Sequence, residues 1–158
     1  MGTFTLEELR AIIQAPMITG LSVAMVDMGI VSTAIEAAAL SKQVAGAAEK
    51  YPNNVIIQAA FSEETLKSKQ IKLDKPNVNP EDVQSGAIID NAIADITTAL
   101  QVVEGKATEA DISEYKQFIY DCGLAVAEAA GSGLFGLGKK VSDNEAATLN
   151  RFKVALGL

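Results

Sequence analysis

The chain has 158 residues, so one hydrophobic core can bury about 70% of the surface of the unfolded chain, and we expect a single domain over residues 1–158. Its formal net charge is −7, and we expect no binding to nucleic acid, because such binding depends on Lys and Arg displacing phosphate counterions. The chain has no histidine, which excludes Ser-His-Asp and Cys-His catalysis and every site that needs a histidine ligand.

The N-terminal segment MGTFTLEELR has no basic region leading into an apolar stretch, so we expect no signal peptide. Residues 11–35 are strongly apolar, and Asp27 is the one charged residue within this stretch. A charge within a membrane span is costly, and Gln14 and Thr19 also interrupt the run. We therefore predict a buried core helix and no membrane span. The single cysteine, Cys122, fits a reducing cytosol, so we predict a cytoplasmic protein. Pro16 is expected to kink or divide this helix, because it cannot donate to the carbonyl four residues back.

Helix N-termini are marked by a side-chain acceptor followed three residues later by an acid, an arrangement that caps the first turn. Such a pattern begins at Thr5, at Thr108 and at Ser142, and the second is predicted to be the weakest because Asp is shorter than Glu. A further start is predicted at Asn79-Pro80, where proline presets the first helical residue.

In chain order, a helix is expected from about residue 32 to 50, and residues 55–71 read as short helix, with a short strand as the alternative. The next three helices should each carry an apolar stripe with steps of three and four residues. Those stripes are Ile89, Ala92, Ile93, Ile96, Ala99, Leu100 and Val103; then Ile112, Tyr115, Phe118, Ile119, Cys122 and Val126; then Ala146, Leu149, Phe152 and Leu156. The sequence thus predicts an all-α, compact bundle of six or seven helices, with Cys122 as a core residue.

The glycine-rich stretch GSGLFGLGKK, residues 131–140, has the spacing of a phosphate-binding loop. A dinucleotide loop needs a preceding strand, and a Walker loop needs Ser or Thr after its lysine, whereas Lys140 follows Lys139 here. Nucleotide binding through this loop is therefore the least favoured function. The stretch is predicted to end one helix and lead to the next.

A short internal repeat relates residues of about 15–50 to those of about 115–158. Gly20-Leu-Ser-Val-Ala recurs as Gly123-Leu-Ala-Val-Ala, each followed by a glycine-containing turn and a helix that begins Ser-x-x-x-Glu or Ser-x-x-Glu. This tandem pattern resembles the TerB family of tellurite-resistance and stress-response proteins. The resemblance implies an all-helical fold of two related halves and a non-catalytic, cytoplasmic protein that works with a membrane-associated protein partner.

The resemblance also implies acidic turns that hold a divalent cation such as calcium. Ala130 stands where the second half of the family pattern has an aspartate, and Met28 intrudes before Gly29 in the first half. The metal-ligand candidates that remain are Asp27, Glu36, Glu128, Asp143 and Glu145.

The alternative for Asp143 and Glu145 is a capping role at a helix start, and for Asp27 a cap or turn role. A carboxylate-based metal-binding protein or metalloenzyme is thus the second functional hypothesis, after a TerB-like binding protein. An uncovered apolar stripe would serve either a protein partner or a homodimer.

Overall fold

The computed structural model describes residues 3–26, 33–68, 71, 81, 86–131 and 141–158. No strand occurs among these residues, and the predicted all-α, compact bundle is confirmed. The helices within the described residues are α1 (Leu6–Val26), α2 (Thr33–Lys50), α3 (Val55–Phe61), α4 (Glu63–Lys67), α6 (Ala87–Val103), α7 (Glu109–Gly131) and α8 (Asp143–Leu156).

Most of the predicted helices are present. Residues 32–50 correspond to α2, and residues 55–71 contain the helices α3 and α4, so the strand alternative was wrong. The start predicted at Asn79-Pro80 lies outside the described residues, and α6 begins after Gly86, whose φ of 76° places it in the left-handed region. That backbone conformation costs least in glycine, which has no Cβ atom.

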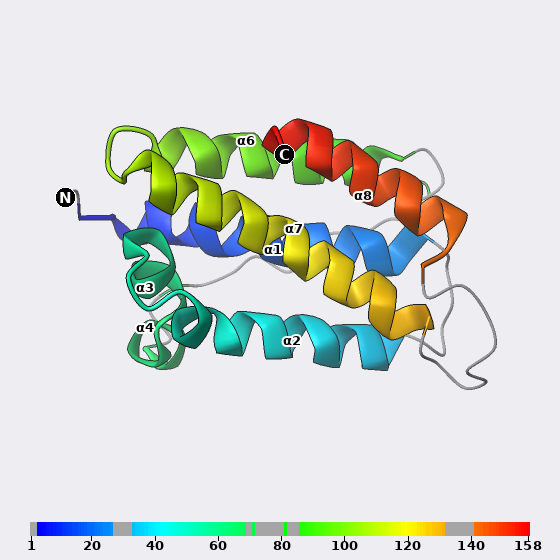
Figure 1. Ribbon diagram of the computed structural model, residues 1–158, viewed down its shortest axis with the longest axis horizontal. Coiled ribbons are helices and arrows are strands. Elements are labelled where there is room, and N and C mark those ends of the chain that lie inside the picture. Colours follow the sequence, from blue (N-terminus) through cyan, green and yellow to red (C-terminus); the bar gives the residue numbers. More distant parts are fainter. Residues whose placement is uncertain (1–2, 27–32, 69–70, 72–80, 82–85, 132–140) are drawn as a thin grey trace.

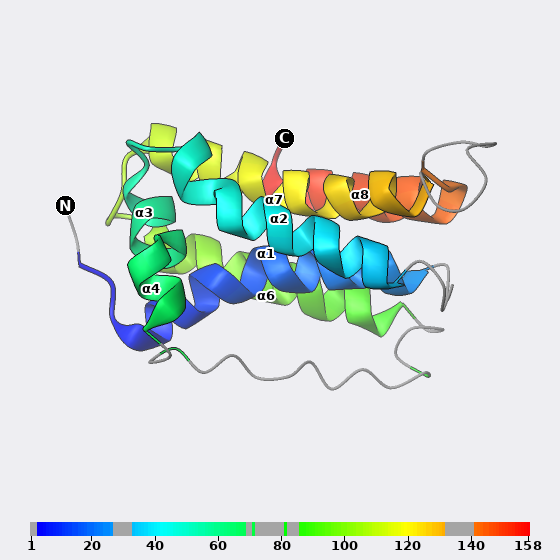
Figure 2. The ribbon, with the colours of Figure 1, turned by 90° about the horizontal axis from the view of Figure 1, so that it is seen from below.

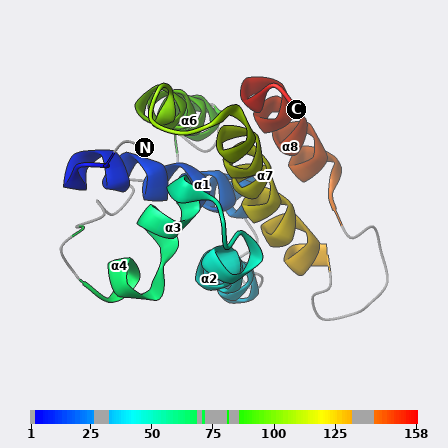
Figure 3. The same ribbon diagram turned by 60° about the vertical axis from the view of Figure 1, so that its left-hand side comes forward.

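The helices form three layers around α1. Helices α6 and α8 make one layer, α1 and α7 the middle layer, and α2 with α3 the third (Figure 1, Figure 3). Helices α1 and α7 run in the same general direction, and α2, α6 and α8 run back against them (Figure 1). Viewed from below, α2 lies over α1 and α7 (Figure 2). One end of the bundle therefore holds the C-terminal ends of α1 and α7 together with the N-terminal ends of α2 and α8.

Helix α1 is the central element, since it packs against α2, α3, α6, α7 and α8. It continues through the buried Pro16 as one helix, so the expectation that Pro16 could divide it was wrong. The reason is a substitute donor: the carbonyl of Ile12, which a residue at position 16 would normally bond, accepts from the hydroxyl of Tyr115 at 2.7 Å. The buried hydroxyls of Thr19 and Ser22 likewise donate to carbonyls four residues back.

The apolar stripes of α6 and α7 form much of the core, as their spacing predicts. In α7 the buried members include Cys122, which is fully buried and confirmed as a core residue. The rings of Phe61 and Phe118 meet edge to face, with centroids 5.0 Å apart. In α8 the prediction was wrong for Ala146, which is exposed, while its neighbour Glu145 is buried. Helix α8 therefore enters the core one residue earlier than its apolar pattern indicates.

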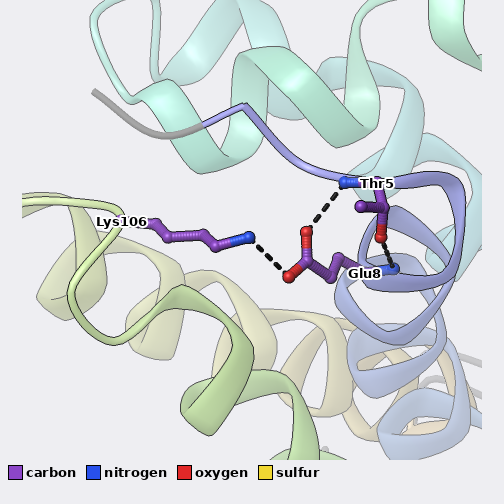
Figure 4. A network of polar contacts seen from close by, with 3 residues as sticks. All are labelled: Thr5, Glu8 and Lys106. Atoms are coloured by element: carbon purple, nitrogen blue, oxygen red, sulfur yellow. Dashed lines mark hydrogen bonds and ion pairs between the residues drawn. The ribbon is translucent and has the colours of Figure 1, made fainter.

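The reciprocal caps predicted from the sequence are present. Thr5 N–H donates to Glu8 Oε2 at 2.8 Å, and Glu8 N–H donates to Thr5 Oγ1 at 3.3 Å (Figure 4). The same carboxylate accepts from Lys106 Nζ at 2.5 Å, which ties the start of α1 to the turn between α6 and α7 (Figure 4). Lys106 therefore lowers the pKa of Glu8, with a smaller contribution from Thr5 N–H.

The start of α7 is also tied to another helix. Asp111 accepts from Thr108 N–H and from Val55 N–H, so one carboxylate serves the first turns of both α7 and α3. Asn54 completes the junction, because its Oδ1 accepts from two backbone N–H groups of α3 and its amide donates to the Asp111 carbonyl at 2.9 Å. The cap at Thr108 was expected to be the weakest, yet its partner Asp111 is buried and joins α7 to α3.

Candidate functional site

The residues proposed as metal ligands differ in how deeply they are buried. Glu36, in the first turn of α2, is 2% exposed, and Glu145, in the first turn of α8, is 4% exposed. Glu128 and Asp143 are exposed. Asp27 lies outside the described residues.

Glu145 acts as the helix cap that its spacing from Ser142 predicts. Ser142 N–H donates to Glu145 Oε2 at 2.8 Å, and Glu145 N–H donates to Ser142 Oγ at 3.1 Å. Within the part of the chain that the structure describes, no three acidic or cysteine side chains are grouped so that they could hold a metal ion. The described acids therefore do not assemble the six to eight oxygen ligands that calcium requires.

The two buried glutamates nevertheless occupy matching positions in the two helix pairs. Each precedes by four residues a leucine whose side chain faces a glycine of the preceding repeat helix: Leu40 faces Gly20, and Leu149 faces Gly123. An ideal Cβ atom on Gly20 would lie 2.7 Å from Leu40, and one on Gly123 would lie 3.2 Å from Leu149. Glycine thus lets the paired helices approach closely in both halves.

The glycine-rich stretch begins at the last residue of α7 and is followed by α8. Helix α7 extends to Gly131, and residues 132–140 lie outside the described residues. The prediction that this stretch leads to a Ser142-capped helix is confirmed at its far end, where α8 begins.

Cys122 does not have the surroundings of a nucleophile. Burial raises the pKa of its thiol, with a smaller contribution in the same direction from Asp121. A reactive cysteine needs a lowered pKa and access to solvent, so this thiol is suited to packing.

A pocket lined by several polar side chains lies between α1 and α6, a feature that was not predicted from the sequence. Its cavity measures about 260 Å³, and Gln14 Nε2 donates to Asp95 Oδ2 across it at 3.2 Å. The helical spacing of Glu7, Arg10 and Gln14 could have shown that they share a face of α1, but not that this face meets α6. The lining residues are Glu7, Arg10, Ala11, Gln14, Asp95 and Thr98.

Among the described helices, α1 has the length and apolar composition that a membrane span needs. In this structure half of its most apolar segment is buried inside the bundle. Core helices of soluble proteins and signal sequences near an N-terminus can have the same length and composition.

The chain matches no protein-family profile, no curated protein and no solved structure.

Proposed function

We propose that this chain is a TerB-like accessory protein of a tellurite-resistance or stress-response system, and that it acts by binding and not by catalysis. The observation that carries the proposal is the paired glycine contact. The related segments on α1 and α7 place Gly20 and Gly123 against Leu40 and Leu149 of the helices that follow them in the repeat. Two helix pairs built alike are what a duplicated, TerB-like bundle requires.

The proposed mode of action is capture of a protein partner, associated with the membrane, by a cytoplasmic bundle. Two features support binding over chemistry. The chain has no histidine, and the Cys122 thiol is buried with a raised pKa. General-base catalysis draws most often on histidine, and a cysteine nucleophile must be accessible and activated.

The test is deletion of the gene in the source organism followed by growth on graded tellurite. The deletion should lower tolerance, and expression of the wild-type chain should restore it. Phe118→Ala serves as the negative control, because removing this buried ring is expected to cost about 3–5 kcal/mol and so deplete the folded protein. Unchanged tolerance, together with no partner retained by the tagged chain from stressed cells, would refute the proposal.

A carboxylate-based cation-binding protein or metalloenzyme is the second candidate, favoured by the burial of Glu36, which is 2% exposed. Calorimetric titration with calcium, magnesium, manganese and zinc tests it. Binding that is lost in Glu36→Gln and retained in Glu49→Gln, an exposed glutamate of the same helix, would support it. Absence of heat at millimolar metal would rule it out.

A further inference from the structure

The pocket between α1 and α6 is lined by several hydrogen-bond acceptors, next to the N–H donors of Arg10. A carboxylate cannot donate, so the Gln14 amide must turn its NH₂ group to Asp95, which leaves Gln14 Oε1 as an acceptor. Thr98 already donates its hydroxyl proton to the Ala94 carbonyl at 3.0 Å, so its remaining capacity is to accept. Asp95 Oδ1 and the Glu7 carboxylate add further acceptors around the same cavity.

The charge of the pocket favours a cation. Glu7 and Asp95 contribute two negative charges and Arg10 one positive charge, so the lining carries a net charge of −1. Because both carboxylates stand on a concave surface between two helices, their potential is concentrated there more than on a flat helix face. A ligand that is positive and rich in N–H donors matches both properties.

The size of the pocket excludes a bare metal ion as the best occupant. Its volume of about 260 Å³ is enough for several water molecules, since each water occupies about 30 Å³ in the liquid. Two carboxylates on two helices also leave a calcium ion short of the six to eight oxygens it needs. An organic cation occupies more of this space than a metal ion does and can lay its methylene groups against Ala11.

We propose that the α1–α6 pocket is a binding site for a small organic ammonium ion of the alkylamine or diamine class. The ammonium group donates to Asp95 and to Gln14 Oε1, and Glu7 at the mouth of the pocket takes the second ammonium of a diamine. This site is independent of the TerB-like function proposed above, and none of its lining residues is among the predicted metal ligands.

The experiment is titration of the ¹⁵N-labelled full chain with 1,4-diaminobutane at about 0.15 M salt, a level that screens diffuse attraction to the acidic surface. Two probes of similar size act as controls: tetramethylammonium has the charge without N–H donors, and 1,4-butanediol has the chain without the charge. The expected result is saturable shifts of amide signals confined to α1 and α6 with diaminobutane, and no saturation with either control.

Asp95→Asn should weaken diaminobutane binding about tenfold, the loss expected for one charge-assisted hydrogen bond. The matched control is Asp90→Asn on the same helix, whose carboxylate pairs with Arg151 at 2.6 Å outside the pocket, and it should leave the affinity within about twofold. Glu7→Gln, at an exposed position, should also weaken diaminobutane binding, and this test does not depend on the packing of Asp95. Absence of saturable shifts, equal binding of the diol, or equal losses in Asp95→Asn and Asp90→Asn would overturn the proposal.

Discussion

The hydroxyl of Tyr115 donates to the carbonyl of Ile12 at 2.7 Å, and Ile12 is the residue four positions before Pro16. Proline has no N–H, so this carbonyl lacks its usual helical donor. Tyr115 is fully buried in α7, and burial raises the pKa of its phenol, which therefore remains a donor at neutral pH. A side chain 103 positions away thus replaces the backbone hydrogen bond that Pro16 removes from the middle of α1.

Tyr115→Phe should destabilise the protein by about 1–3 kcal/mol, because it keeps the ring but leaves a buried carbonyl without its donor. In a Pro16→Ala background the new N–H at position 16 can bond Ile12, so the same change should cost about 1 kcal/mol less. Urea denaturation of the four proteins in this cycle measures the difference. An equal cost of Tyr115→Phe in both backgrounds would show that the two residues are not coupled through Ile12.

The close approach at Gly123 should not tolerate a methyl group. A Cβ atom there would lie 3.2 Å from both Leu149 and Thr19, and both neighbours are held in the core. Gly123→Ala is therefore expected to destabilise the protein by about 1–3 kcal/mol, despite the higher helix propensity of alanine.

Gly46 provides the matched control, since it also lies inside a helix but a Cβ atom there would have no neighbour within 4 Å. Gly46→Ala should stabilise the protein by about 0.5–1 kcal/mol. Thermal and urea unfolding of the two variants measure these changes in stability. Stabilisation by both substitutions would mean that the α1–α7–α8 crossing does not depend on glycine.

The local features of the fold could be predicted from the sequence, whereas its long-range polar contacts could not. The cap at Ser142 and the apolar stripe that contains Tyr115 and Cys122 follow from spacing along one helix. The bond from Tyr115 to Ile12 depends on how α7 crosses α1, which spacing does not determine. Pro16 was expected to kink or divide α1, and the same reason explains why the alternative of a division was wrong.

Of the candidate sites, too, only the features that lie along one helix could be predicted from the sequence. Glu145 was open to two interpretations, and its bond to Ser142 N–H makes it a cap. The α1–α6 pocket could not be predicted, because Gln14 and Asp95 are separated by 81 residues and only the packing of two helices brings them together. Spacing identifies which residues share a helix face, but it does not identify the helix that packs against that face.

Asn54→Ala should be among the more destabilising polar substitutions in the described chain. Asn54 is 1% exposed, caps α3 through two N–H groups, and donates to Glu114 at 2.9 Å as well as to the Asp111 carbonyl. Loss of the cap and of the buried bonds is expected to cost about 2–4 kcal/mol. Asn91→Ala, at an exposed position of α6, should change the unfolding free energy by less than about 0.5 kcal/mol. Equal unfolding midpoints for the two variants would contradict a structural role for the junction.

The junction should also make stability depend on pH through Asp111. Burial acts to raise the pKa of this carboxyl group, but bonds from Thr108 and from Val55 N–H outweigh it, and the net direction is downward. A carboxyl whose folded pKa is lowered binds fewer protons in the folded chain than in the unfolded chain. Its contribution to stability is therefore complete above the ordinary pKa of aspartate, about 3.9, and is lost as the pH falls through the lower folded pKa.

Asp111→Asn should accordingly cost about 1–3 kcal/mol at pH 7, because an amide offers one acceptor oxygen where the carboxylate offers two. The cost should shrink as the pH falls below about 4, because the unfolded wild-type chain then binds a proton at Asp111 and the folded chain binds it only at lower pH. Urea denaturation at several pH values between 7 and 2 measures it, with Glu104→Gln in the preceding turn, an exposed position, correcting for the loss of one negative charge. A difference between wild type and Asp111→Asn that stays constant or grows toward acid pH would show that the native hydrogen bonds do not favour the ionised carboxylate.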